Sequence, residues 1–387
     1  MECPNRLRKN MRSIESERIP IKLWLEEIED SALEQAKNVA NLPVSFHHIA
    51  IMPDCHFGHG VAIGTVFASE EAIIPNAVGV DIGCGMCALK TNLTEISTEN
   101  LKKIMGHIRK LVPVGFEHHK ETQAEELLPK NIPNCPVIKS EFKSALRQIG
   151  TLGGGNHFIE IQKGSDNHIW IMIHSGSRNL GLKVAGHYNN IAEKMHPSDT
   201  KLSWLDLNTD EANAYLASMD FCVSFALVNR NLMMSNIIRS FNLVCPIEEF
   251  NLINIAHNYV HLEEHYGKNV YVHRKGATSA QKDEIGIIPG SQGTKSYIVK
   301  GRGNPESFNS CSHGAGRLLS RTAARNNLNL EKEIENLNAQ GVIHSIRRTQ
   351  DLDEAPSAYK DIDTVMSNQR DLTDIIVELK PLAVIKG

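Results

Sequence analysis

The chain has 387 residues, 41% of them hydrophobic and 22% charged, a balance typical of folded globular proteins that excludes intrinsic disorder and a collagen-like structure. Its 41 basic and 45 acidic residues leave a formal net charge of −4, so any nucleic-acid contact must come from a local basic groove. The cysteines are scattered and follow no signal peptide, which favours a reducing, cytoplasmic location over a secreted disulfide framework. They are Cys3, Cys55, Cys84, Cys87, Cys135, Cys222, Cys245 and Cys311.

The N-terminal segment is predicted to be a helical cover. Residues 10–44 carry spaced apolar positions among acids, which indicates short helices over a core face. No linker rich in Pro, Gly or Ser divides the chain, so we expect one large domain over residues 1–387, with residues 1–44 as the cover and residues 45–387 as the motif-bearing core. No apolar run approaches the ~20 residues that cross a bilayer, so no membrane partner is expected.

Strand-like and helical segments follow one another in the first half of the core. Residues 49–92 are β-rich and punctuated by glycine. Charged helical segments are predicted at 97–111, 119–128 and 139–148. Strand-like sequence returns in GTLGGGNHFIEI and IWIMIHSGSRNLG, where polar residues gather at the strand ends.

The second half repeats the alternation on a larger scale. Residues 205–265 have apolar positions at three- and four-residue spacing, which predicts long helices. Strands and glycines return at VYVHRKGAT, IGIIPGSQGTKSYIVKG and SFNSCSHGAGR, and after a polar stretch over 326–370 the apolar C-terminus is expected to rejoin the core. The irregular alternation predicts a mixed α/β or α+β fold, with central β-sheets flanked by helices.

Asp81 and Cys84 are the first candidate metal ligands. They stand three residues apart after the predicted strand VGVD, and Gly83 and Gly85 permit a tight backbone, so both side chains can reach one ion. The alternatives for the segment Cys84-Gly-Met-Cys87 are two small buried thiols or a redox pair.

Two histidines stand at the ends of predicted strands. His157 follows three glycines and Asn156, where bare backbone can approach phosphate oxygens. His174 ends the apolar run IWIMI and opens Ser-Gly-Ser-Arg, a placement that favours a site. The alternative for each is a buried core histidine with its hydrogen bonds satisfied.

Three further histidines are four residues apart on one face of a predicted helix, so that a pair of them could hold a metal ion. They are His257, His261 and His265. Glu263 and Glu264 indicate that the His261/His265 end is solvated, whereas His257 has apolar neighbours and is predicted to point inward.

Two loops of small residues suit phosphate. His313 opens His-Gly-Ala-Gly-Arg, which combines backbone N–H groups, an imidazole and a guanidinium, and its histidine could be a metal ligand, a general acid or base, or a nucleophile. The alternative is a glycine turn with an exposed histidine. The loop 289–294 lacks the Lys-Ser/Thr ending of a Walker motif. Arg274 and Lys275 offer two cations nearby, or a solvated charged pair.

Ten segments, in order from about residue 45 to the C-terminus, together resemble the RtcB family of GTP-dependent RNA-splicing ligases. They are MPDCHFGHG, VGVDIGCGM, GTLGGGNHFIEI, IHSGSRNLG, AHN, HRKGAT, IPGSQGTKSY, SCSHGAGRLLSR, DEAPSAYK and IKG. The resemblance implies the family's own α/β fold and an enzyme that joins RNA ends bearing a 2′,3′-cyclic phosphate or 3′-phosphate to 5′-hydroxyl ends. It also implies GTP and two Mn²⁺ ions as cofactors, an archease-type activator as a partner, and a role in tRNA splicing or RNA repair.

The resemblance also implies the role of individual residues. Cys84 would bridge the two Mn²⁺ ions, one also held by Asp81 and His157, the other by His174 and His257. His313 would be the nucleophile that takes GMP, and Glu160, Ser296 and Lys386 would recognise guanine. The implied GTP contacts are Asn156, His157, Phe158, Ile159, Glu160, His257, Asn258, Pro289, Gly290, Ser291, Gln292, Ser296, His313, Gly314, Ala315, Gly316 and Lys386.

The chain departs from the family pattern in two places. Gln292 stands where methionine is common, and the segment after Arg274-Lys275 is shorter than in many members. Two other functions remain open at this stage: a dinuclear-metal RNA phosphohydrolase or cyclic phosphodiesterase without sealing activity, and a non-catalytic RNA-binding protein. Trapping of guanylate on His313 would discriminate the ligase from the hydrolase.

Overall fold

The N-terminal part of the chain builds four strands of a six-stranded sheet. The computed structural model describes residues 11–387, so Cys3 and the start of the predicted cover lie outside the described residues. The strand order is β1 (Arg12–Ile14), β2 (Ile21–Leu23), β3 (Phe46–His56), β4 (Ile63–Ser69), β12 (Lys268–Lys275) and β11 (Asn258–His265). Only β2 and β3 run parallel.

The predicted cover of short helices is only partly right. One helix, α1 (Asp30–Ala40), buries Ala32, Ala36 and Val39 against β3. Residues 21–23 form a strand, since Ile21 and Leu23 are buried on either side of Lys22 and therefore follow the two-residue period of a sheet.

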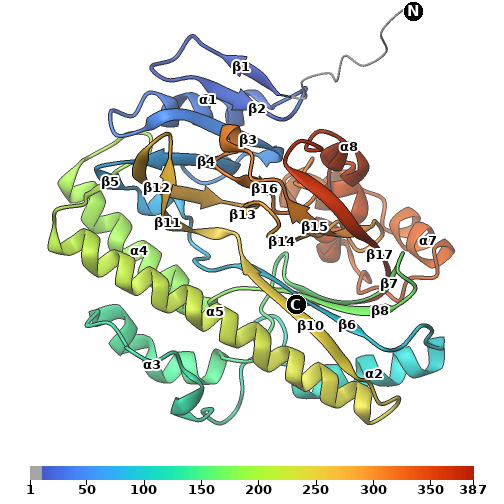
Figure 1. The fold of residues 1–387 in the computed structure, drawn as a ribbon. Coiled ribbons are helices and arrows are strands. Elements are labelled where there is room, and N and C mark those ends of the chain that lie inside the picture. Colours follow the sequence, from blue (N-terminus) through green and yellow to red (C-terminus); the bar gives the residue numbers. More distant parts are fainter. Residues whose placement is uncertain (1–10) are drawn as a thin grey trace, which may run out of the picture.

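A seven-stranded antiparallel sheet holds most of the motifs. Its order is β10 (Glu249–Ala256), β6 (Gly85–Thr91), β8 (Ile169–Ser175), β7 (Phe158–Gly164), β17 (Thr373–Lys386), β15 (Ser296–Gly301) and β14 (Ile285–Ile288). The apolar C-terminus does rejoin the core, because β17 pairs with β7 on one side and β15 on the other. The mixed α/β class is confirmed, and Figure 1 shows helices flanking both sheets.

Helices cover the outer faces of the sheets. The larger ones are α2 (Thr98–Leu111), α3 (Pro136–Gln148), α4 (Arg178–Met195) and α5 (Asp210–Asn242). The predictions at 97–111 and 139–148 are confirmed, whereas 119–128 is mostly irregular around the short η2 (Glu125–Leu127). Among the described residues α5 is the one helix long and apolar enough to cross a membrane, yet half of its apolar window is buried, and it packs on β6, β8 and β10 as a core helix does.

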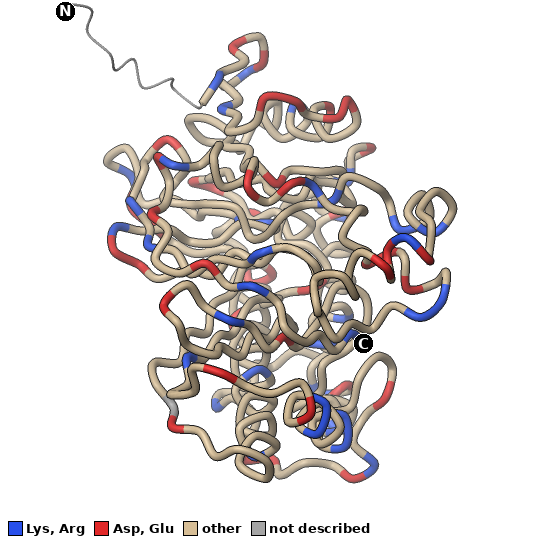
Figure 2. The backbone as a smooth tube through the Cα atoms, turned by 90° about the vertical axis from the view of Figure 1, so that its right-hand side faces the viewer, with Lys and Arg blue, Asp and Glu red and all other residues tan. Residues whose placement is uncertain are grey.

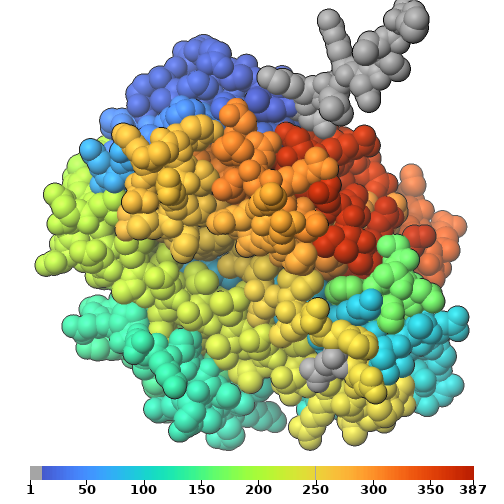
Figure 3. Space-filling model, viewed as in Figure 1, coloured from blue at the N-terminus to red at the C-terminus, as the bar shows by residue number. Residues whose placement is uncertain are grey.

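Shorter elements connect the two sheets. β5 (Ala72–Ile73) pairs with β9 (Leu205–Asp206), and β13 (Ala277–Ser279) pairs with β16 (Ser310–Ser312). The remaining short α-helices are α6 (Arg321–Asn327), α7 (Leu330–Ala339) and α8 (Ile362–Ser367). The remaining 3₁₀ helices, labelled η, are η1 (Pro75–Ala77), η3 (Pro305–Ser307), η4 (Thr349–Glu354) and η5 (Pro356–Ala358). In Figure 3 the yellow-to-red C-terminal half spans the middle of this face, with the blue N-terminal segments at one end.

The predicted long helix over 205–265 is wrong in its second part. Helix α5 ends at Asn242, and residues 249–265 form β10 and β11, which belong to different sheets. Ile253 and Ile255 pack toward the core while Asn254, between them, accepts a hydrogen bond from Arg230 of α5, an alternation of period two. A four-residue interval is even, so the histidine spacing fits one face of a strand as well as one face of a helix.

Candidate active site

Three loops and the end of β8 carry the candidate ligands and meet at one edge of the seven-stranded sheet. Gly85 at the start of β6 pairs with Ser175 at the end of β8, and His174 pairs with Phe158 at the start of β7. On the other side Ala256 at the end of β10 also pairs with Gly85. Because neighbouring strands of an antiparallel sheet run in opposite directions, the end of one lies beside the start of the next. The antiparallel order therefore gathers these loops.

The Asp81–Cys84 loop is a turn before β6 and does not end a strand, so the predicted strand VGVD is wrong. Gly79 and Gly83 adopt φ of +91° and +74°, a conformation that strands do not use. A side chain on Gly83 would collide with the backbone of α5, and one on Gly176 would collide with the carboxylate of Asp81. The glycines thus let the loop approach both α5 and the end of β8.

A buried thiol and two imidazoles form a compact donor cluster. Cys84 Sγ lies 3.4 Å from His157 Nε2 and 3.2 Å from His174 Nε2. Asp81 Oδ2 lies 3.1 Å from the same His157 nitrogen. Backbone carbonyls fix both rings from behind, with Leu152 O accepting from His157 Nδ1 and Asn156 O accepting from His174 Nδ1. The Nε2 atoms are therefore directed at the thiol.

His257 extends this cluster toward His313. Its ring centroid lies 5.2 Å from that of His174 and 4.8 Å from that of His313. The residue is buried, as predicted, and its Nδ1 atom has no hydrogen-bond partner among the described residues. An unpartnered buried nitrogen beside a thiol and two imidazoles is the donor set that Mn²⁺ or Zn²⁺ takes, so the residues present fit a metal centre.

The electrostatics of the cluster also suit a cation. Burial lowers the pKa of His174 and of His257 well below the usual range, so both are neutral imidazoles with a lone pair to donate. Burial and the neighbouring Asp81 raise the pKa of the Cys84 thiol. A cation at this position would reverse that effect and stabilise the thiolate.

His313 is held by an aspartate that the sequence analysis did not single out. Asp54, in β3, is fully buried, and its Oδ2 accepts hydrogen bonds from His313 Nδ1 at 2.6 Å and from the backbone N–H groups of His313 and Gly314 at 3.1 and 3.2 Å. Burial alone would raise the pKa of Asp54, but its interaction with His313 holds the pKa below the usual value. The sequence signals of Asp54 are an acid inside the apolar strand IAIMPDCH and its place in the segment MPDCHFGHG.

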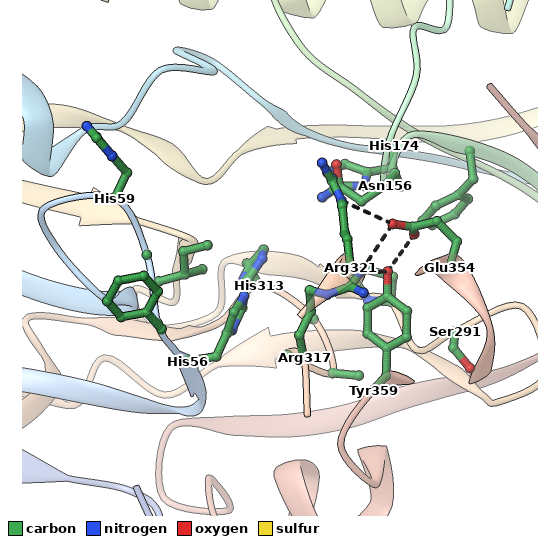
Figure 4. Close-up of a pocket in the computed structure, with 18 of the residues that line it drawn as sticks. His56, His59, Asn156, His174, Ser291, His313, Arg317, Arg321, Glu354 and Tyr359 are labelled. Carbon is green, nitrogen blue, oxygen red and sulfur yellow. Dashed lines mark hydrogen bonds and ion pairs between the residues drawn. The ribbon is translucent and has the colours of Figure 1, made fainter. Parts of the chain in front are cut away.

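His313 lines a cavity of about 660 Å³. In Figure 4 its ring and that of His56 lie on one side of this cavity, with Arg317, Arg321, Glu354 and Tyr359 on the other. Most of the implied GTP contacts line it: Asn156, Phe158, Glu160, Pro289, Gly290, Ser291, Gln292, His313, Gly314, Ala315, Gly316 and Lys386. The structure therefore brings these residues together around a space of ligand size.

Other implied contacts lie behind the cavity wall. Ile159 packs in the core with Ile161, because alternate residues of β7 face opposite sides. Asn258 donates to the carbonyl oxygen of Asp81 at 3.1 Å and accepts from the N–H of Gly276 at 2.8 Å, so it positions the Asp81 loop. Ser296, also buried, accepts a hydrogen bond from Gly290 N at 3.1 Å.

Acidic residues occupy one end of the cavity. Glu160 is buried, Gln162 Nε2 donates to its Oε2 at 2.7 Å, and burial raises its pKa to about 8. Lys386 Nζ lies 2.8 Å from Glu354 Oε2, and Tyr359 donates to the same oxygen at 2.6 Å. No role was predicted for Glu354 from the sequence. The only sequence signal for this residue is its place in the segment DEAPSAYK.

The remaining candidates are not at the cavity. Arg274 is fully buried and pairs with Glu263, and Lys275 Nζ donates to the carbonyl oxygens of His59 and Asn76, so the pair is neither solvated nor cavity-lining. Cys87 packs in the core, which leaves Cys84 as the thiol of the cluster.

The other two histidines of the spaced triplet, His261 and His265, also lie away from the cluster. His261 is exposed as expected, but His265 is buried, 3.1 Å from Glu263 Oε2, which corrects the prediction that this end is solvated.

Comparison with known proteins agrees with the geometry. The family model "tRNA-splicing ligase RtcB" matches residues 35–135 and 128–387. The chain is 39% identical to the RNA-splicing ligase RtcB of Escherichia coli (strain K12), covering 98% of this chain and 100% of that protein. It is 33% identical to the tRNA-splicing ligase RtcB of Nanoarchaeum equitans, covering 93% of this chain and 92% of that protein. The identity to the tRNA-splicing ligase RtcB of Thermococcus kodakarensis is 31%, with the same coverage.

Proposed function

The chain belongs to the RtcB family and is an RNA ligase, and from this premise we propose that it uses GTP and Mn²⁺ to join RNA 3′-phosphate or 2′,3′-cyclic phosphate ends to 5′-hydroxyl ends. One observation carries the proposal: the His313 imidazole, held by Asp54 at 2.6 Å, faces both a thiol–imidazole cluster and a cavity large enough for a nucleotide. A nucleophile, a cation site and a nucleotide pocket are the three parts that guanylate transfer needs.

His313 is the residue that takes the nucleotide. Donation from Nδ1 to Asp54 leaves the Nε2 lone pair free to attack the α-phosphorus of GTP. The new N–P bond replaces the P–O bond to the β-phosphate, pyrophosphate leaves, and Asp54 stabilises the positive charge that develops on the ring. The product is a guanylyl group on His313.

Sealing uses that guanylyl group in two further displacements. A cyclic phosphate is first hydrolysed to a 3′-phosphate, whose oxygen attacks the guanylyl phosphorus and releases the His313 imidazole. The RNA end then carries a pyrophosphate-linked guanosine. The 5′-hydroxyl of the second RNA attacks the RNA phosphate, GMP leaves, and a 3′–5′ phosphodiester remains.

The donor cluster would hold the metal ions. Asp81, Cys84, His157, His174 and His257 would bind the two Mn²⁺ ions. When bound, the ions supply positive charge that neutralises the phosphate oxygens.

Glu160 and Lys386 would recognise guanine, and Ser296 would support Glu160 through Gln162, which donates to both. An ionised Glu160 accepts hydrogen bonds from the ring N–H and exocyclic amine that distinguish guanine from adenine. Lys386 lies over the Phe158 ring, 5.5 Å from its centroid, and would supply a charged donor at the base. We also propose a cytoplasmic location, which the free thiols of the described cysteines support, and an archease-type activator, which would raise the ligation rate when added.

Incubation with α-labelled GTP and Mn²⁺ tests the proposal. The intact protein should acquire acid-labile label and should convert a 3′-phosphate RNA and a 5′-hydroxyl RNA into one longer product. A phosphohydrolase would remove the terminal phosphate without binding label, so an unlabelled protein that still degrades RNA ends would replace the ligase with the hydrolase.

Asp54→Asn should slow guanylylation on the order of 10²–10⁴-fold, because the ring loses the charge that stabilises its cationic form. The rate of label incorporation in a single turnover measures this. The substituted amide keeps an oxygen acceptor, so the melting temperature should change much less than the rate. Equal guanylylation rates for the wild type and Asp54→Asn would show that Asp54 takes no part in the mechanism.

Guanine-nucleotide affinity should rise with pH. Burial raises the pKa of Glu160 to about 8 in the nucleotide-free protein, so below pH 8 a proton must leave before the carboxylate accepts hydrogen bonds. The dissociation constant of GMP should fall by up to about tenfold per pH unit between pH 6 and 8 and then level off. Glu160→Gln should weaken binding and flatten this profile, which calorimetry measures. If GMP affinity depended on pH in the same way in the wild type and in Glu160→Gln, Glu160 would have no role in guanine recognition.

A further inference from the structure

A second hollow adjoins the nucleotide cavity. It has a volume of about 600 Å³ and shares Gln292, Glu354 and Lys386 with the first cavity. We call it the terminal groove, because the C-terminal residue lines it. Its other lining residues are Gly155, Arg325, Ser345, Ile346, Arg347, Arg348, Gln350, Asp351, Asp353 and Gly387. A chain lying in the terminal groove would reach the nucleotide cavity past Lys386.

Most cations of the terminal groove are already paired with carboxylates. Arg325 pairs with Asp353 at 2.6 Å, and Lys386 pairs with Glu354 at 2.8 Å. Arg348 lies 3.6 Å from Asp351 in a more exposed pair. Figure 2, which faces this side of the molecule, shows acidic and basic segments side by side near the C-terminus. The paired cations contribute little net field.

Two arginines near the terminal groove have no carboxylate partner among the described residues. Arg347 donates to the carbonyl oxygen of Ile346 at 2.7 Å and contacts His344. Arg109, exposed in the last turn of α2, has no hydrogen bond or ion pair to a described residue. Arg109 follows Ile108, which shares a core cluster with Ile385, and α2 contacts β17, so this end of the helix lies beside the strand end that lines the groove. Partial desolvation and repulsion from Arg347 lower the pKa of Arg109. An anion between two unpaired guanidinium groups would be stabilised by both.

An aromatic side chain stands beside the same groove. Phe116 is 99% exposed. Its turn is held in place because Gly115 N donates to Gly153 O at 3.0 Å and Leu152 N donates to Pro113 O at 2.9 Å. Gly387, which lines the terminal groove, packs against Gly115. Exposure of a large apolar ring to water costs free energy. A ring held on a fixed turn is a suitable surface for a nucleobase to stack on.

We propose that the terminal groove binds a single-stranded segment of the RNA substrate next to the end being joined, with a backbone phosphate between Arg109 and Arg347 and a base stacked on Phe116. The proposal rests on the proposed ligase function, and it supplies the local basic groove that a chain of net charge −4 needs. Guanidinium groups on the backbone together with an aromatic platform are the usual combination for single strands bound without sequence preference.

Binding of a fluorescent single-stranded RNA with a 3′-phosphate, measured without GTP over a range of salt concentrations, tests the groove. The double variant Arg109→Gln/Arg347→Gln should bind about tenfold more weakly, and its slope of log affinity against log salt should be shallower by about 0.7, the value for one phosphate contact on a single strand. Phe116→Ala should also lose about tenfold in affinity, but with the salt slope unchanged, because stacking releases no counterions.

Arg302→Gln is the matched control. Arg302 is an exposed arginine beside Asp374, at the opposite end of β17 from Lys386, and its substitution should leave both affinity and slope at the wild-type values. Wild-type affinity and slope in the double variant would overturn the proposal. Labelling with α-labelled GTP needs no RNA, so each of these variant proteins should label normally. Absence of labelling in the wild-type protein would instead overturn the proposed function.

Discussion

His313→Ala should abolish labelling by α-labelled GTP. The substitution removes the only nitrogen that is both held by Asp54 at 2.6 Å and turned to the nucleotide cavity among the described residues, so no N–P bond can form. We expect label incorporation and RNA joining to fall together, on the order of 10⁴-fold or more, as in other enzymes that lose their nucleophile. Scintillation counting of acid-precipitated protein and gel analysis of the RNA measure the two quantities.

A second histidine substitution separates loss of the nucleophile from a general effect. His261 is exposed on β11, in the six-stranded sheet, and His261→Ala should label and ligate as the wild type does. Nucleotide affinity of His313→Ala should remain measurable, because the remaining lining of the cavity is intact. Label that persists in His313→Ala would show that another side chain takes the guanylate, and the mechanism above would then be wrong.

Cys84→Ala should remove the metal centre. Cys84 Sγ lies close to both His157 and His174, at 3.4 and 3.2 Å, and alanine offers no replacement ligand. We expect the affinity for Mn²⁺ to fall by at least about 100-fold, more than the loss typical for residues that only support a ligand. Metal content after equilibrium dialysis measures this directly, and both labelling and joining should be lost with the metal.

Cys87→Ala is the matched control for this substitution. Its thiol is equally buried but packs among apolar side chains of the core, so its loss should lower stability by about 1 kcal/mol while leaving metal content unchanged. Full activity and normal Mn²⁺ content in Cys84→Ala would refute the role of Cys84 as a metal ligand. A metal-free Cys84→Ala that is still labelled would show that guanylylation does not depend on this centre.

Errors in the predicted secondary structure arose where local spacing is ambiguous. Helix α5 was predictable over 33 residues because its apolar positions persist at helical spacing. The segment 249–265 was misassigned because its apolar positions lie at three- and four-residue spacing, which predicts a helix, although a spacing of four also suits one face of a strand, and only pairing with β6 and β12 decides between them. Strand VGVD failed for a related reason, since apolar residues next to glycine do not reveal a positive φ.

Residues that act through a neighbour were harder to find than residues with reactive side chains. Cys84, His174 and His313 were identified from thiols, imidazoles and glycine turns that local sequence displays. Asp54 was missed because its partner His313 lies 259 positions away in the chain. Glu354 was missed for the same reason, since it contacts Lys386 from 32 positions away. Such pairs form only when β3 and β17 have taken their positions in the folded protein.

The sequence by itself determined the class of fold, the family and the set of groups able to donate to a metal or a phosphate, because those depend on residue type and on order along the chain. Tertiary structure alone decided which of those groups meet. The antiparallel order β10-β6-β8-β7 places three loops and the end of β8 at one sheet edge. His257, between β10 and β11, lies between the thiol cluster and His313. Contacts of this kind depend on strand pairing over long sequence separations, which no local pattern encodes.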